Sequence, residues 1–343
     1  MLRPIDEKFF FEAFLEAEKG IGHTRPNPPV GAVIVKDGEI VARGYHKKCG
    51  SDHAEVAAIK NAKRHHVDIK GASMYVTLEP CSQKGRVGAC TEAIISSGIK
   101  EVYYGVRDPN PQMCGKAKAV LKKGGVKAYE APSKSDIALL CRTLIKAFEK
   151  RMNRGLPYVT VKLAMSLDGK ICDDYGNAKW ISSSDARQFT GKFREHVDVI
   201  LVGAETVRKD NPSLVSHAKK NPDLVRAVIT KSGSLPKNAK IFTDGENKTL
   251  IFKPKKGEKA DAEFLRRVMM DLASRGYMWV LCEGGLKLAT ALAEAGLVDE
   301  WMTVLSPCVI GTRKISEKIE FGNISPIGVH LKIKELVSKC LRV

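Results

Sequence analysis

Apolar and polar positions alternate in short blocks along the first 130 residues. Apolar runs at 30–36 and 39–45 flank Asp37 and Gly38, and a DG turn between two such runs predicts a β-hairpin. Strands that alternate with helices usually lie parallel, so this half predicts a mostly parallel sheet with helices on both faces. The remaining predicted elements are strands at 73–79, 102–106 and 126–130 and helices at 53–63, 91–97 and 115–123.

A long helical block at 133–152 separates this pattern from a second one. A serine stands at its start, and Gly155 and Pro157 follow its end. We therefore divide the chain into domains 1–152 and 153–343. The second domain again predicts α/β structure, and we expect its last strand pair to close the sheet as an antiparallel edge. Its predicted strands are 157–166, 198–205, 226–230, 249–252, 277–283 and 300–307.

Composition and termini narrow the class of protein. The length of 343 residues suits two domains, and 43% hydrophobic with 28% charged residues is ordinary for a soluble protein. The first 20 residues carry acids throughout and predict an amphipathic helix, not a signal peptide. Nine cysteines without a secretion signal favour a reducing compartment, where cysteines serve metals more often than disulfides. We expect a cytoplasmic protein without a membrane span.

The formal charge of +18 leaves three interpretations open. A basic chain can bind nucleic acid, act on phosphorylated substrates, or simply carry a solvated basic surface. The lysines are spread in twos and threes along the sequence and form no long basic arm. Charge alone therefore decides nothing.

His53, Glu55, Cys81 and Cys90 carry the strongest chemical pattern. One histidine and two cysteines give Zn²⁺ three ligands and leave a fourth position for water, whose pKa then falls to about 7. Glu55 follows the histidine by two residues, where a proton shuttle between water and a departing amine is needed. H-x-E…P-C…C is the general signature of zinc deaminases, although eight residues separate the cysteines here in place of two. The competing interpretation is a chance spacing of ordinary buried thiols.

Many further segments match one known family in order along nearly the whole chain. They are 25–35, 44–46, 53–55, 77–86, Cys90 and 108–112 in the first half, and 161–171, 180–187, 200–214 and 282–300 in the second. On these segments the sequence resembles the bifunctional deaminase/reductase family of riboflavin biosynthesis. The resemblance implies a cytidine-deaminase-like three-layer α/β domain followed by a dihydrofolate-reductase-like α/β domain. It also implies two reactions, zinc-dependent deamination of a diaminopyrimidine ribosylamine 5′-phosphate and reduction of the ribosyl group to a ribityl chain by NADPH.

The resemblance also implies site residues. The deaminase substrate would lie among Asn27, His46, Gln83 and Arg86, and a guanidinium such as that of Arg86 suits phosphate. The reductase substrate would contact Lys162, Ser182, Arg194, Asp210, His217 and Glu283. The dinucleotide would lie along Ala164, Trp180, Thr206, Asp210, Gly284 and Gly285. The Gly284-Gly285 turn before a helix near Leu286 can hold a pyrophosphate, whereas a G-x-G-x-x-G motif is missing from the sequence.

The sequence departs from the family pattern at three points. Gln83 stands where the family usually has a histidine, and glutamine cannot carry a proton charge. His217 stands where the family has an arginine, and a histidine is only partly charged at neutral pH. A third difference is Val87-Gly88-Ala89 in place of a TPP triplet. None of these touches the zinc ligands or Glu55, but all concern the neighbouring contacts.

Two other functions compete with the bifunctional enzyme. One is a base deaminase of RNA or nucleosides, which the aromatic content of only 6% disfavours because single-strand binders stack bases on aromatic rings. The other is a reductase whose deaminase half has lost or changed its substrate, an idea motivated by Gln83. We expect a phosphorylated pyrimidine substrate, no nucleic-acid or membrane partner, and a homo-oligomer of two or four chains. The apolar segment 301–310 fits either a dimer edge or a buried strand.

Overall fold

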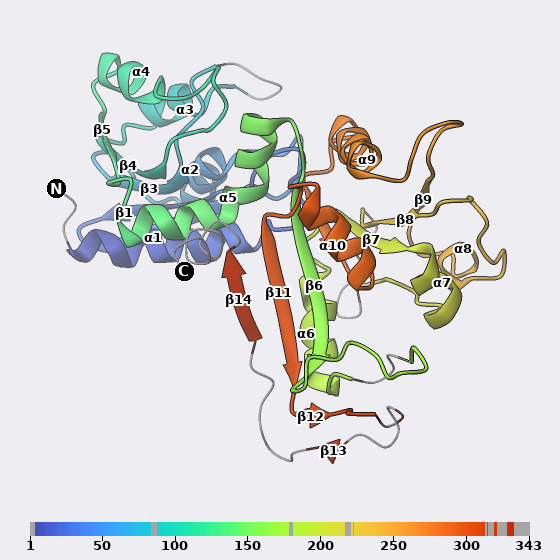
Figure 1. The fold of residues 1–343 in the computed structure, drawn as a ribbon. Coiled ribbons are helices and arrows are strands. Elements are labelled where there is room, and N and C mark those ends of the chain that lie inside the picture. Colours follow the sequence, from blue (N-terminus) through green and yellow to red (C-terminus); the bar gives the residue numbers. More distant parts are fainter. Residues whose placement is uncertain are drawn as a thin grey trace, which may run out of the picture. The chain divides into compact units, whose positions relative to one another are not determined.

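The computed structural model divides into two compact units, Met1–Gly155 and Leu156–Val343 (Figure 1). It describes residues 4–83, 88–177, 181–216, 221, 223–312, 314, 319–320 and 328–332. The unit boundary follows the helix that we predicted over 133–152, which here runs from Asp136 to Arg154. Gly155 ends this helix in the left-handed conformation, with a φ of 65°, which glycine adopts without strain.

Unit 1 contains a five-stranded sheet with the strand order β2-β1-β3-β4-β5. β1 pairs antiparallel with β2 and with β3, while β3, β4 and β5 are parallel. The predicted hairpin is confirmed, but the prediction of a mostly parallel sheet is wrong for this unit. The loop and helix between β2 and β3 return the chain to the opposite side of β1. The strands are β1 (Gly31–Lys36), β2 (Glu39–Tyr45), β3 (Ser73–Leu78), β4 (Glu101–Val106) and β5 (Lys127–Glu130).

Helices cover both faces of this sheet. Gly31 lies against the backbone of the first helix at Ala13 and Ala17, and Gly44 lies against the backbone of the second at Ala54 and Ala58. Because Gly44 pairs with the neighbour of Gly31, the two helices occupy opposite faces. The helices are α1 (Pro4–Glu18) and α5 (Asp136–Arg154) on one face and α2 (Ala54–Arg64), α3 (Cys90–Ser96) and α4 (Ala117–Lys123) on the other. The result is the expected three-layer arrangement.

Unit 2 contains a seven-stranded sheet with the order β14-β11-β6-β10-β7-β8-β9. All its strand pairs are parallel except the pair of β11 with β14 at one edge. The strands are β6 (Tyr158–Ser166), β7 (Val199–Gly203), β8 (Val225–Ile229), β9 (Thr249–Phe252), β10 (Trp279–Cys282), β11 (Glu300–Ser306) and β14 (Gly328–Lys332). A separate short pair joins β12 (Cys308–Val309) and β13 (Ile319–Glu320).

The antiparallel edge of this sheet is present, but its composition differs from our prediction. β10 and β11 do not pair with each other, because each lies parallel to β6 on opposite sides of it. The edge is formed by β11 with β14, a strand that the sequence pattern did not predict. β11 is therefore an interior strand, and the apolar segment that begins at Trp301 is not an open sheet edge.

Successive residues of the unit 2 strands build two cores. Val199 and Leu201 pack with one set of helices, whereas Ile200 and Val202 pack with the other. This alternation is what a sheet covered on both faces requires. The helices are α9 (Ala262–Ser274) and α10 (Leu286–Glu294) on the first face, and α6 (Ser184–Phe193), α7 (Ala204–Asp210) and α8 (Lys240–Thr243) supply or adjoin the second core. Within the described ranges, no helix is both long and apolar enough to cross a bilayer.

Candidate functional site

Three potential metal ligands converge at the start of two helices in unit 1. His53 precedes α2 as its N-cap residue, and Cys90 is the first residue of α3. Cys81 lies in the turn after β3, where its carbonyl accepts from the Thr91 amide and its Sγ from the Cys90 amide at 3.3 Å. The ligand atoms of the three side chains all lie within 4.8 Å of one another.

The geometry of this group suits zinc. The Nδ1 atom of His53 is 3.5 Å from Sγ of Cys81 and 3.3 Å from Sγ of Cys90. Tetrahedral zinc with ordinary Zn–N and Zn–S bonds places such atoms about 3.6 Å apart. Hydrogen bonds from the Cys90 thiol and from His53 also lower the pKa of Cys81 to about 4, so a thiolate ligand is available. The residues therefore fit a three-ligand zinc site.

Glu55 lies beside this group in the first turn of α2. Its side chain is only 3% exposed, and it is close enough to Cys90 for a hydrogen bond. Burial, with a smaller contribution from the Cys81 thiolate, raises the pKa of Glu55 to about 7. A metal cation bound nearby would lower the pKa of Glu55. A carboxyl group in this position is suited to accept and release a proton near neutral pH.

Asn27 and His46 form a hydrogen-bonded pair next to the zinc ligands. The Nδ1 atom of His46 lies 3.0 Å from the Asp52 carbonyl, which can only accept, so Nδ1 carries the proton. Its Nε2 atom then accepts from the Asn27 amide nitrogen at 3.1 Å, which leaves the Asn27 side-chain oxygen as an acceptor. The rings of His46 and His53 are 5.3 Å apart and nearly perpendicular. Burial lowers the pKa of His46, in agreement with a neutral ring.

Glu79 has a structural role that was not predicted from the sequence. This carboxylate is 3% exposed and accepts three backbone N–H bonds, from Asp108 at 3.2 Å, Gly115 at 2.9 Å and Ala117 at 3.0 Å. It thereby holds the segment 108–117 against the turn that carries Cys81. The only signal in the sequence was its place beside Pro80 and Cys81.

Gln83, the first departure from the family pattern, contacts the same segment. Its amide nitrogen donates to the Gln112 carbonyl at 3.3 Å, and its side chain is exposed. Gln83 thus lies two residues after Cys81. Among the described residues, it makes no hydrogen bond to His53, Cys81 or Cys90 (the zinc group). Arg86, which we expected at the substrate phosphate, lies outside the described residues.

Unit 2 brings together three of the expected reductase residues. Lys162 of β6 and Glu283 after β10 are neighbours because Val161 pairs with Cys282 on these parallel strands. Arg194 follows α6 and binds Glu283 through two N–H···O bonds of 2.7 and 2.9 Å. Burial lowers the pKa of Lys162, whereas the charge of Glu283 raises it. A substrate phosphate or carbonyl near this cluster would meet two cations and one carboxylate.

The expected dinucleotide turn lies at the carboxyl ends of β7 and β10. Gly285 is the N-cap of α10, with no side chain capping the helix. A Cβ on Gly284 would come within 2.8 Å of Leu288 and 3.4 Å of the Gly203 amide, so a glycine allows this close approach. Open parallel sheets bind ligands at this end of their strands, and free N–H groups of a helix N-terminus suit a pyrophosphate.

The other expected reductase residues surround these elements. Thr206 and Asp210 lie on α7, which begins directly after β7, and Ala164 lies on β6. Ser182 precedes α6, and its carbonyl accepts from Arg187 at 2.5 Å. Trp180 and His217 lie outside the described residues.

The comparisons with known proteins agree with this arrangement. The family model "Cytidine and deoxycytidylate deaminase zinc-binding region" matches residues 3–106, and "RibD C-terminal domain" matches residues 157–340. The chain is 35% identical over 327 residues to the riboflavin biosynthesis protein RibD of Aquifex aeolicus, covering 91% of this chain and 89% of that protein. RibD of Escherichia coli is 33% identical, with coverage of 90% and 89%.

Solved structures show the same likeness over both units. The diaminohydroxyphosphoribosylaminopyrimidine deaminase/5-amino-6-(5-phosphoribosylamino)uracil reductase of Thermotoga maritima superimposes with a TM-score of 0.81 at 32% identity, covering 94% of this chain and 93% of that one. Fold and site thus define a zinc-dependent deaminase joined to a reductase. The chain belongs to the RibD family of riboflavin biosynthesis, in which a zinc-binding deaminase domain precedes an NADPH-using reductase domain. The predicted fold class, enzyme class and cofactors are confirmed.

Proposed function

We propose that unit 1 deaminates 2,5-diamino-6-ribosylamino-4(3H)-pyrimidinone 5′-phosphate and that unit 2 reduces the product, 5-amino-6-(5-phosphoribosylamino)uracil, with NADPH. The observation that carries the proposal is the convergence of His53, Cys81 and Cys90 beside the buried Glu55. The same chain also brings together Lys162, Arg194 and Glu283, called the Lys162 cluster below. The name of the Thermotoga maritima relative, a diaminohydroxyphosphoribosylaminopyrimidine deaminase, supports this substrate class.

In the first reaction, water replaces the ring amino group and ammonia leaves. His53, Cys81 and Cys90 would hold Zn²⁺, which supplies a water of lowered pKa when it is bound. Glu55 would take a proton from the attacking water molecule and return it to the departing nitrogen. Asn27, fixed by its bond to His46, offers its side-chain oxygen to the substrate. Arg86 and Gln83 are proposed as contacts of the ribosyl phosphate.

In the second reaction, the ribosyl ring opens to an imine and its carbon accepts a hydride that NADPH would supply, while a proton goes to the nitrogen. Lys162 and Arg194, held by Glu283, would bind the substrate together with Ser182, Asp210 and His217. The dinucleotide would lie along the Gly284-Gly285 turn, with Ala164, Trp180 and Thr206 beside it. His217 offers a weaker and more pH-dependent phosphate contact than arginine.

An ammonia-release assay on the zinc-loaded full chain tests the proposal. We expect ammonia without NADPH, followed by oxidation of one NADPH per substrate after its addition. Failure of both steps would contradict the proposal. NADPH oxidation on the deaminated intermediate without any ammonia release would instead favour the alternative, a reductase whose deaminase half has a different substrate.

We further propose a cytoplasmic homo-oligomer of two or four chains. Three large apolar side chains of α1 and α5, two helices in contact, support an interface in unit 1: Phe11, Leu15 and Leu139 are 51%, 38% and 50% exposed. Light scattering on the purified chain would show a dimer or tetramer, and a monomer at micromolar concentration would rule this out.

A further inference from the structure

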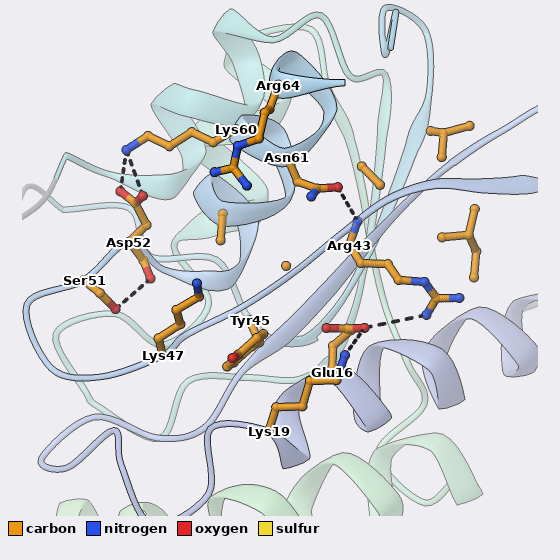
Figure 2. A pocket seen from close by; sticks show the side chains of 15 residues that line it. Glu16, Lys19, Arg43, Tyr45, Lys47, Ser51, Asp52, Lys60, Asn61 and Arg64 are labelled. Carbon is orange, nitrogen blue, oxygen red and sulfur yellow. Dashed lines mark hydrogen bonds and ion pairs between the residues drawn. The ribbon is translucent and has the colours of Figure 1, made fainter. Parts of the chain in front are cut away.

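A pocket of about 550 Å³ lies at the open edge of the sheet in unit 1 (Figure 2). It is bounded by α1, β2, the loop at 47–52 and the outer side of α2. Its lining contains none of the zinc ligands and none of the residues expected at the deaminase substrate. The volume falls in the range of about 300–1,000 Å³ that is typical of small-molecule sites.

The lining of this edge pocket is strongly basic. Five basic side chains face two acidic ones, and they come from separate elements: Lys19, Arg43, Lys47, Lys60 and Arg64 against Glu16 and Asp52. A concave surface lined by one sign of charge concentrates ligands of the opposite sign. The charge of the pocket therefore favours an anion.

Three of these cations are already paired. Lys19 binds Glu16 at 2.7 Å, and Lys60 binds both oxygens of Asp52 at 2.8 Å. Arg43 binds Glu12, a residue of α1 outside the lining, at 2.5 Å. Both carboxylates of the pocket, Glu16 and Asp52, are thus already paired with a cation.

Lys47 and Arg64 are the cations left for a ligand. Both are exposed, and no ion pair to either occurs among the described residues. Figure 2 shows the ammonium group of Lys47 directed toward α2, which carries Lys60 and Arg64. Lys60 and Arg64 are four residues apart on this helix, so their like charges repel each other, and an anion between the elements would relieve that repulsion.

The rest of the lining includes apolar surface that can contact the organic part of a ligand. Tyr45 is half-buried in the pocket, with the Nζ atoms of Lys19 and Lys47 at 5.9 and 6.0 Å from its ring centre. Ile40 and Val41 of β2 extend this surface. A single inorganic phosphate would leave most of the volume empty.

We propose that the edge pocket binds a small organic phosphate, whose phosphate group lies between Lys47 and Arg64 and whose ring or chain contacts Tyr45. Arginine and lysine together suit a phosphate monoester, because arginine provides a fork of donors and lysine a point charge. Asp52 lines this pocket, and its carbonyl accepts from His46, whose ring lies 5.3 Å from that of the potential zinc ligand His53. The pocket is thus a second ligand site of the deaminase unit.

Calorimetric titration of the zinc-loaded full chain with uridine 5′-monophosphate tests the proposal at 0.15 M salt. The pocket variant is Lys47→Gln with Arg64→Gln, and the matched control is Lys122→Gln with Lys123→Gln, which removes two exposed charges from α4. We expect the pocket variant to lose at least one binding event or to weaken it at least tenfold, with the control like the wild type. Uridine, which lacks the phosphate, should show no difference between the variants.

The catalytic groups are unchanged in both variants, so their zinc content and ammonia release check the fold and the proposed function independently. Equal weakening in both variants would show that overall charge, not the pocket, attracts the phosphate. Unchanged binding in the pocket variant, or no binding by the wild type, would likewise overturn the proposal.

Discussion

Glu55 combines burial with the role in proton transfer that we propose for it. The side chain is nearly excluded from water, and this exclusion raises its pKa to about 7. It remains beside Cys90 because α2 begins at Ala54, directly after the ligand His53. The residue that we propose to move the proton and the residue that we propose to hold the metal are therefore fixed by the same first turn of helix.

We expect Glu55→Gln to lower ammonia release by at least about 10²-fold, because the amide cannot take a proton from water. Zinc content should be unchanged, and reduction of the deaminated intermediate should stay near normal. Steady-state rates of the two half-reactions and metal analysis measure these effects. Glu39→Gln, an exposed change on β2, is the control. Loss of both activities in the Glu55 variant would show that the two sites are not independent.

Glu79 supports a second prediction, for stability. In the wild type, three backbone N–H groups donate to the Glu79 carboxylate. In Glu79→Gln, an amide NH₂ group replaces one of the two acceptor oxygens and faces these donors. We expect a loss of about 1–3 kcal/mol in the free energy of unfolding, since buried donors without an acceptor are costly. Urea unfolding followed by far-ultraviolet dichroism would measure it, with the exposed Glu18→Gln as control. A change below about 0.5 kcal/mol would mean that the segment 108–117 is held by other contacts.

Some residues of the candidate site could be predicted from the sequence and others could not. His53, Cys81 and Cys90 were found because zinc restricts its ligands to a few residue types, so their spacing is informative. Glu79 was not identified as a support, because its partners are backbone groups and any sequence supplies those. The expected roles of the substrate contacts, from Asn27 to Glu283, stay predictions.

At the level of elements, the sequence predicted most strands and helices within a few residues. Apolar runs and Gly or Pro breaks determine where an element lies, and both are local properties. Pairing partners depend on how the chain returns after each helix, which local pattern does not encode. The antiparallel pairings of β1 with β3 and of β11 with β14 were missed for this reason.

Gly44 links element packing to the zinc group. A Cβ at this position would lie 2.2 Å from the Ala58 amide and 2.6 Å from the Ala54 carbonyl, so Gly44→Ala must push α2 away from β2. We expect a loss of about 1–3 kcal/mol in unfolding free energy and weaker zinc binding, because His53 and Glu55 move with the helix. Gly88→Ala, where no atom of the described residues lies within 4 Å of the added carbon, is the matched control. Equal effects of the two changes would contradict the close-packing argument.

The Arg194–Glu283 pair joins α6 to the end of β10. The two side chains are 13% and 11% exposed, so removing one partner leaves a largely buried charge alone. We expect Arg194→Ala and Glu283→Ala each to destabilise unit 2 by about 3 kcal/mol, and the double variant to lose clearly less than the sum. A double-mutant cycle in urea measures the difference. Additive losses would show that the pair contributes no mutual stabilisation.

At the scale of the whole molecule, each unit has its own sheet, its own core and its own candidate site. The zinc ligands all belong to unit 1, and the Lys162 cluster with the Gly284-Gly285 turn belongs to unit 2. A ligand that binds only the folded form of one unit stabilises that unit by mass action. Zinc should therefore stabilise unit 1 against unfolding, and NADPH should stabilise unit 2.

We expect calorimetry of the full chain to show two thermal transitions with different cofactor responses. Removal of zinc by a chelator should lower the midpoint of one transition, because the three ligands lose the ion that joins the starts of α2 and α3. NADPH at 100 times its dissociation constant should raise the other by the equivalent of about 2.7 kcal/mol. Cys81→Ser should mimic zinc removal and leave the NADPH response intact. A single transition that both cofactors shift together would show that the two units unfold as one body. Zinc and NADPH binding to the Cys81→Ser variant would then be measured separately to assign each cofactor to its unit.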